Sequence, residues 1–134
     1  MIRKDYILRM VEEFAKFLAA IVGLKNEGKY NEALKKIDAV YTGLIDIDPI
    51  ILKSLSPEEM ITFLKNEDKY SNQYLKIIAE LLFEEGQIYA ESGDPVSARN
   101  VLVKAKMLIN YLSENDSTFS FDWYEKISII DSLL

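Results

Sequence analysis

GQIYAESGDPVSARNVLVKA, residues 86–105, contains a helix end, a tight turn and the beginning of a second helix. Gly93 is suited to the left-handed conformation that terminates a helix. Asp94 supplies a capping oxygen, and Pro95 supplies a fixed φ for the first turn of the helix that follows. Gly86 allows a second helix backbone to approach closely because it has no side chain. The stretch therefore predicts an antiparallel helical hairpin.

Residues 28–34, GKYNEAL, echo the second half of this hairpin. When Gly28 is aligned with Gly93 without gaps, every matched position is apolar or small. The matched pairs are Ala33 with Ala98, Ile37 with Leu102, Val40 with Ala105, Leu44 with Ile109, Leu24 with Tyr89, Ile21 with Gly86 and Phe17 with Leu82. A second hairpin of the same kind is therefore expected near the N-terminus.

The spacing resembles the tetratricopeptide repeat (TPR), a helical hairpin with the pattern W-x2-L-G-x2-Y…A-x3-F. The matching positions are Leu82, Gly86, Tyr89, Ala98, Leu102 and Ala105. Glu85 stands where the pattern has leucine, and Ile21 replaces the small residue in the first hairpin. The resemblance implies an all-α fold in which TPR-like antiparallel hairpins stack into an α-α superhelix.

The remaining residues are assigned around these hairpins. The interval between Gly28 and Gly93 is shorter than two full repeats, so the residues between the hairpins are interpreted as an insertion. Within it, Asp48 and Ser56 each precede a proline and each begin a short helix. The predicted single domain, residues 1–134, contains a hairpin at 4–46, the insertion with two short inserted helices at 48–69, a hairpin at 71–114 and a C-terminal capping helix at 121–133.

The N-terminal string RKDYILRMVEEF, residues 3–14, resembles the opening of a small, uncharacterised bacterial family of unknown function whose members are TPR-like. The Leu-Ser-x-Glu-Glu segment of that family is similar to residues 55–59. This resemblance covers most of the chain and implies no activity.

Composition removes several classes of function. The chain contains no cysteine and no histidine, so it lacks thiol nucleophiles, zinc–thiolate ligands and the commonest general base. Its net charge of −6 disfavours nucleic acid as a partner. The apolar run at residues 17–24 is too short to span a bilayer, so we expect no membrane insertion and a cytoplasmic location.

The helix before Gly93 carries the candidate partner-binding residues. If the first helix of each hairpin faces a groove, as the resemblance implies, Glu80, Phe83, Gln87 and Glu91 face the partner. Phe83 could equally be covered by the inserted helices, and both readings stay open. Glu85 has the register of the hairpin interface, where Arg99 or Lys104 could pair with it. A structural role is favoured for Glu85, although a buried carboxylate can also be functional.

The first helix has an apolar arc wider than one neighbour requires. One row is predicted to be buried in the core: Ile7, Met10, Phe14, Phe17, Ile21 and Leu24. A second row lies beside it, and three of its members are candidates for self-association: Val11, Leu18 and Val22. Two hairpins are fewer than the three usually needed to stabilise a helical stack, so something must cover the open ends. The last helix can cover one end, and the inserted helices or a second subunit can cover the other. The broad apolar arc of the first helix favours a homodimer.

Function is left open between two classes. The favoured hypothesis is a non-catalytic scaffold that binds a protein or peptide, and the alternative is a small-molecule-binding or sensory helical domain. An enzyme is disfavoured, and no catalytic, cofactor-binding or metal-binding residue is assigned. Asp38, Asp46 and Asp48 are interpreted through helix capping rather than as a cation site, because calcium loops need denser oxygen ligands and a turn glycine.

Overall fold

The computed structural model describes residues 2–67, 70–116, 120 and 122–134. The elements found over these residues are all helical. The prediction of an all-α chain is therefore confirmed for the described part. The predicted start of the capping helix at Phe121, and part of each connection that flanks the second hairpin, lie outside the described residues.

The first hairpin pairs α1 (Ile2–Asn26) with α2 (Tyr30–Val40). Gly28 has a φ of 75° between them, as expected for a glycine that ends a helix. The sequence predicts that the second helix continues as an α-helix to Asp46, but it ends in a π-helical segment, η1 (Tyr41–Ile45). Asp46 there has a φ of 61° and donates its N–H to the carbonyl of Tyr41, which stabilises the wider turn.

The second hairpin pairs α5 (Asn72–Glu91) with α6 (Pro95–Asn115). Its turn repeats the hydrogen bonds of the first one. The N–H of Asp94 donates to the carbonyl of Tyr89 over 2.8 Å, as the N–H of Lys29 does to Leu24 over 2.9 Å. These are the bonds of the Schellman motif. The two turns therefore share one geometry at the positions that the sequence alignment matched.

The insertion forms α3 (Pro49–Ser54) and α4 (Pro57–Asn66), each begun by the predicted cap. The Asp48 carboxylate accepts from the N–H of Ile50 over 2.9 Å, which confirms that Asp48 caps a helix. Ser56 and Glu59 exchange hydrogen bonds of 2.8 and 3.1 Å in a capping box. The local signals therefore placed both helix starts correctly.

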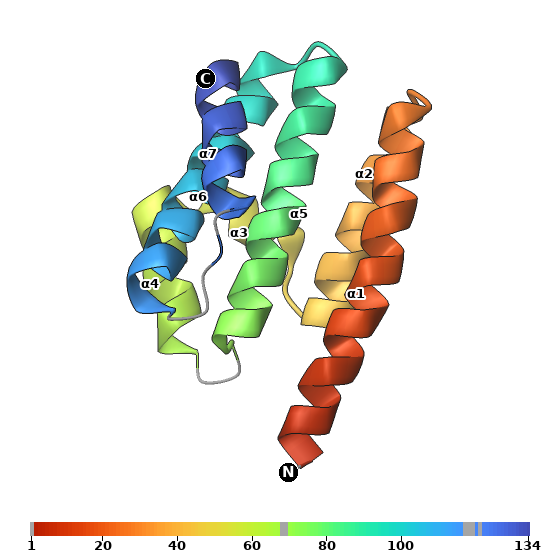
Figure 1. The fold of residues 1–134 in the computed structure, drawn as a ribbon. Helices are drawn as coiled ribbons and strands as arrows, with labels where there is room; N and C mark the ends of the chain where they lie inside the picture. The colour runs from red at the N-terminus through yellow and green to blue at the C-terminus, as the bar shows by residue number, and fades with distance from the viewer. Residues whose placement is uncertain (1, 68–69, 117–119, 121) are drawn as a thin grey trace.

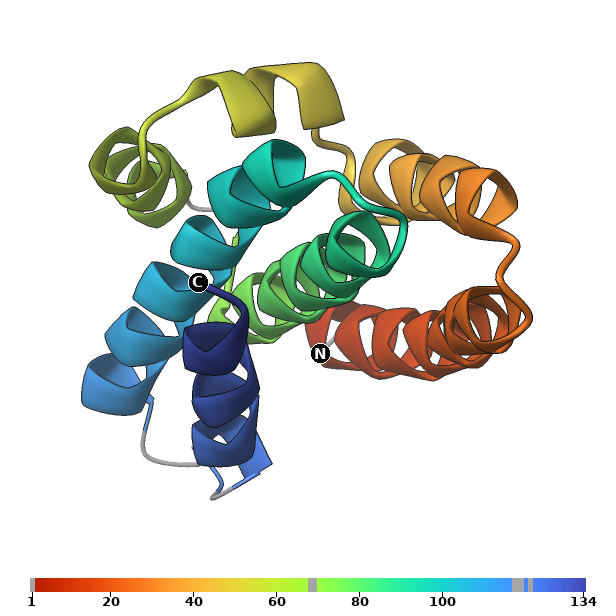
Figure 2. The same cartoon turned by 90° about the horizontal axis from the view of Figure 1, so that it is seen from above.

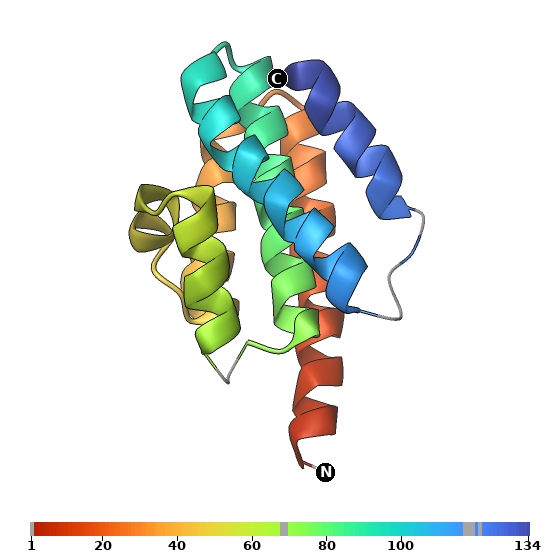
Figure 3. The same ribbon diagram turned by 90° about the vertical axis from the view of Figure 1, so that its left-hand side faces the viewer.

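The central element of the fold is α5, which contacts α1, α2, α6 and α7 (Asp122–Leu133). Figures 1 and 2 show α1 and α7 on either side of α5, while α2, α3 and α4 lie behind it. The first turns of α1 project beyond the other helices (Figure 3). The position of α5 gives it one face that is bordered by two helices distant in sequence.

Close packing at Gly86 joins α5 to α6. A methyl group at this position would overlap the side chain of Leu102, which is fully buried. In α1, Met10, Phe14 and Ile21 are buried as predicted. Phe17, which the sequence predicts to be buried with them, is 38% exposed. The prediction for Phe17 is wrong because this side chain lies at the edge of α2, where it lines a shallow depression.

Candidate functional site

A polar strip runs along the side of α5 that lies between α1 and α7. We call it the acidic strip, and its members are Glu80, Glu84, Gln87 and Glu91. Their spacing of four, three and four places them on one side of the helix. The strip contains three carboxylates, and most of the buried residues of α5 other than Glu84 and Glu85 are apolar. It is the polar surface that the fold builds around its central helix.

The α1 border of the strip is fixed by Lys25. Its Nζ donates to Glu84 Oε1 over 2.8 Å and to Gln87 Oε1 over 3.0 Å. Both members of the Lys25–Glu84 ion pair are largely removed from solvent. This pair is therefore better placed to stabilise the fold than an exposed one, whose contribution is usually below about 1 kcal/mol.

The α7 border is fixed by Lys126. Its Nζ lies 3.4 Å from Glu80 Oε1, 5.3 Å from the centre of the Phe83 ring and 5.6 Å from that of Trp123. Burial raises the pKa of Glu80, and Lys126 offsets only part of this effect. Lysines from two helices thus reach the strip from opposite sides.

The predicted partner-binding residues have different environments. Phe83 is only 4% exposed, so the expectation of an exposed Phe83 in an open groove is wrong. The cation that covers its ring comes from α7 rather than from the inserted helices. Glu80 and Gln87 are half-buried, and Glu91 is exposed at the end of α5. Three polar residues of the predicted set therefore remain at the surface between α1 and α7.

The predicted self-association residues lie on one side of α1. Val11 is 38% exposed, and Leu18 and Val22 are half-buried. Leu8, which is not among the predicted residues, is 54% exposed on the same side. The spacing of these residues could have revealed Leu8, since it precedes Val11 by three positions.

A buried polar cluster lies on another side of α5, centred on Glu85. This carboxylate is fully buried and forms an ion pair with Lys53 of α3. It also accepts hydrogen bonds from the hydroxyls of Tyr41, over 3.3 Å, and Tyr89, over 3.5 Å. The partner of Glu85 is therefore Lys53 of the insertion, and the predicted pairing with Arg99 or Lys104 is wrong.

Burial dominates the electrostatics of this cluster. It raises the pKa of the Glu85 carboxyl, because the attraction of Lys53 only partly offsets the loss of solvent. Burial alone would lower the pKa of Lys53, but the charge and hydrogen bonding of Glu85 raise it overall. The pKa of Tyr41 is raised by burial first and then by Glu85. Tyr41 therefore keeps its proton and serves as a hydrogen-bond donor.

Lys104 of α6 completes the attachment of the insertion. Its side chain is almost completely buried, and Nζ donates to the carbonyl of Lys53 and to Asn100 Oδ1, each over 2.7 Å. A cation at the end of α3 is favourable because the last carbonyls of a helix lack partners within it. Burial lowers the pKa of Lys104, while nearby Glu85 opposes this effect. The cluster thus attaches the short helix α3 to α5 and α6.

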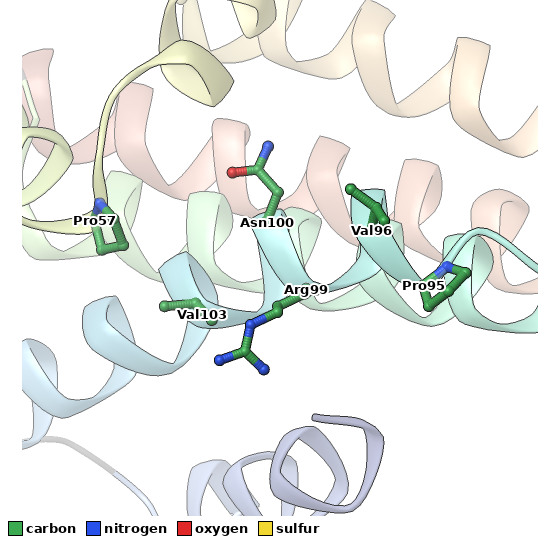
Figure 4. A pocket seen from close by; sticks show the side chains of 6 residues that line it. All are labelled: Pro57, Pro95, Val96, Arg99, Asn100 and Val103. Carbon is green, nitrogen blue, oxygen red and sulfur yellow. The ribbon is translucent and has the colours of Figure 1, made fainter.

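Arg99 lies in a depression of about 570 Å³ on the outer side of α6. The depression is lined by Pro57, Pro95, Val96, Arg99, Asn100 and Val103 (Figure 4). In Figure 4, the Arg99 and Asn100 side chains point in opposite directions from α6. The lining is mainly apolar, and Arg99 is its charged residue.

No group of three or more acidic side chains suited to a metal ion occurs in the described part of the chain. The helices described there also include none that is long and apolar enough to cross a membrane. Comparisons with family models, with curated proteins and with solved structures give no match to the chain. A function for this chain is therefore inferred from its own geometry.

Proposed function

We propose that the chain is a non-catalytic, cytoplasmic scaffold with a TPR-like arrangement of hairpins, which binds a protein or peptide partner at the acidic strip. The observation that carries this proposal is the acidic strip itself, a polar surface on the central helix that is bordered by α1 and α7. Glu91 is exposed at its end, and Gln87 and Glu80 are half-buried within it. The proposed partner presents basic side chains to this surface.

Charge supports this choice of partner. The strip carries three carboxylates, and Lys25 and Lys126 pair with only Glu84 and Glu80. The whole chain has a net charge of −6. Complementary charge accelerates encounter and selects among partners, even where it adds little to affinity. A basic segment is therefore favoured over an acidic one at this face.

Affinity capture from the native cell tests the proposal with Glu91→Lys and a matched control, Glu114→Lys. Both glutamates are exposed in the last turn of a long helix, so both changes have a similar effect on helix stability. We expect a protein that is retained by the wild-type chain and by Glu114→Lys, and lost with Glu91→Lys. Retention of the same proteins by all three, or of none above background, would contradict the proposal.

The alternative, a small-molecule-binding or sensory domain, is supported by the depression around Arg99. Its volume falls within the range of small-molecule sites, and its apolar lining with one cation suits an apolar anion. An anionic fluorescent dye that binds the wild-type chain, and binds less tightly after Arg99→Gln, would favour this function. If Arg99→Gln binds the dye as tightly as the wild-type chain, the proposal of a small-molecule site at Arg99 is wrong.

A further inference from the structure

We propose that an arginine side chain of the partner binds on Glu80, Phe83 and Trp123, in the place that Lys126 occupies in this structure. We call these three residues the cation site. Lys126 then competes with the partner and limits its affinity for the chain. This inference rests on the proposed function, because Glu80 is the first member of the acidic strip, and it names the side chain that the strip recognises.

The cation site combines one carboxylate with two aromatic rings. The Nζ of Lys126 lies 3.4 Å from Glu80 Oε1, 5.3 Å from the centre of the Phe83 ring and 5.6 Å from that of the Trp123 ring. Both ring distances are within the range of cation–π contacts. The two aromatic side chains are buried, so water screens the attraction less than at an open surface. The site is therefore built for a cation, and the ammonium group of the chain itself is bound there.

Lys126 is held more loosely than the other lysine that borders the strip. Lys25 donates hydrogen bonds of 2.8 and 3.0 Å to Glu84 and Gln87, and its side chain is 11% exposed. The Nζ of Lys126 is 3.4 Å from Glu80, and its side chain is 23% exposed. A lysine has a flexible stem of four carbons. The Nζ of Lys126 can therefore turn into solvent and leave the site to another cation.

This exchange does not require α7 to leave α5. Ile130 and Trp123 of α7 are buried in the core. Lys106 of α6 also binds Asp131 of α7, over 2.7 Å. The helix α7 lies alongside α5 (Figures 1 and 2). The carboxylate and the two rings therefore stay together when the side chain of Lys126 turns away.

Arginine suits the cation site better than lysine. Its planar guanidinium stacks on an aromatic face and can donate two parallel hydrogen bonds to one carboxylate. It is also more weakly hydrated than an ammonium group, so it leaves water at a lower cost. Exposed Glu91 lies eleven positions after Glu80, about 16 Å along the helix axis. An extended basic segment of about six residues is long enough to contact both carboxylates.

Calorimetric titration with a hexa-arginine peptide at physiological salt tests the exchange. Lys126→Gln should bind the peptide about 5-fold more tightly than the wild-type chain, because the peptide no longer competes with the ammonium group. Lys106→Gln is the matched control, since it removes the same charge and also separates an ion pair with α7. The carboxylate that it releases, Asp131, is exposed. Lys106→Gln should therefore change the affinity by less than about 2-fold.

A double variant separates the cation site from the net charge. Glu80→Gln combined with Lys126→Gln has the net charge of the wild-type chain, and it should lose the gain that Lys126→Gln produces. The fluorescence of Trp123, the single tryptophan, reports binding at the site in the same titrations.

Four results would overturn the inference while the proposed function stands. They are wild-type binding that Lys126→Gln does not tighten, equal tightening by Lys106→Gln, a gain that persists in the double variant, and binding that leaves the fluorescence of Trp123 unchanged. A peptide that none of the four chains binds would contradict both the inference and the proposed function.

Discussion

The contact between Gly86 and Leu102 gives a sharp prediction for Gly86→Ala. The added Cβ would overlap Cγ and Cδ2 of Leu102 and lie 3.2 Å from its Cδ1. Leu102 is fully buried, so its side chain cannot move into solvent. The helices α5 and α6 would have to separate, or Leu102 would have to leave its preferred rotamer.

The expected magnitude combines two opposing effects. Overpacking a buried contact costs about 1–3 kcal/mol. Replacing glycine by alanine within a helix returns about 0.5–1 kcal/mol, because the unfolded chain loses conformational freedom. The overlap involves Cγ as well as a terminal methyl group, which places the cost in the upper part of its range. Gly86→Ala is therefore expected to lower the free energy of unfolding by about 1–2 kcal/mol.

The same substitution at Gly23 provides the matched control. Gly23 is also inside a long helix, and nothing lies within 4 Å of a Cβ added there. Gly23→Ala should therefore stabilise the protein by about 0.5–1 kcal/mol. Urea unfolding followed by the fluorescence of Trp123, the single tryptophan, measures both variants. Urea midpoints are compared at one protein concentration.

The close contact between Gly86 and Leu102 also predicts that one substitution partly rescues the other. Leu102→Ala alone leaves a cavity and should cost about 2–5 kcal/mol. In the double variant the methyl group introduced by Gly86→Ala occupies part of that cavity, so the combined cost should be smaller than the sum of the two single costs. Equal stabilisation by Gly86→Ala and Gly23→Ala, or simple additivity with Leu102→Ala, would refute the proposed packing of α5 against α6.

Two further predictions concern charged groups. Glu85→Gln should cost about 1–3 kcal/mol, since it removes the counter-charge of half-exposed Lys53 while keeping a hydrogen-bond acceptor. The raised pKa of Glu85 means that the folded state binds the proton of this carboxyl more tightly than the unfolded state does. This proton binding adds most to the free energy of unfolding below about pH 4, and the added stability is lost as the pH rises through the folded pKa. Glu85→Gln cannot titrate, so urea unfolding at several pH values should show that this pH-dependent part is abolished. Hydrogen bonds from Ser97 lower the pKa of Asp94, so its contribution is present above about pH 4 and is lost as the pH falls through the folded value. Asp94→Asn keeps a capping oxygen but not the charge, so the difference in unfolding free energy between this variant and the wild type should disappear in acid. A difference that stays constant with pH would contradict a stabilising role for the charge of Asp94.

Features that depend on a few adjacent residues could be predicted from the sequence. The left-handed glycines and the capping aspartate and serine were found because a cap is formed by residues within one turn. The alignment of Gly28 with Gly93 also predicted matching turns, and the same hydrogen bonds occur in both. The π-helical end of the first hairpin was not predicted, because its left-handed residue is Asp46 rather than a glycine.

The environments of the candidate site residues depended on distant elements. The sequence left Phe83 either exposed in a groove or covered by the inserted helices. In the structure its ring lies under the side chain of Lys126, forty-three positions later in the chain. The spacing of residues within α5 cannot predict a contact with a residue of α7. Lys25 likewise reaches Glu84 from another hairpin. The sequence identified the polar side of α5, whereas the contacts of each residue on it required the packing of α1 and α7.

Glu85 shows how the insertion changed the role of one repeat position. The repeat pattern has leucine here, and a leucine would fill the space with an apolar side chain. It would also leave the buried Tyr41 hydroxyl without its acceptor, at a cost of about 1–3 kcal/mol, and Lys53 without its buried counter-charge. Glu85 satisfies both groups and thereby attaches α3 to the central helix. The departure from the repeat pattern is therefore explained by the inserted helix, and the carboxylate needs no catalytic role to account for its burial.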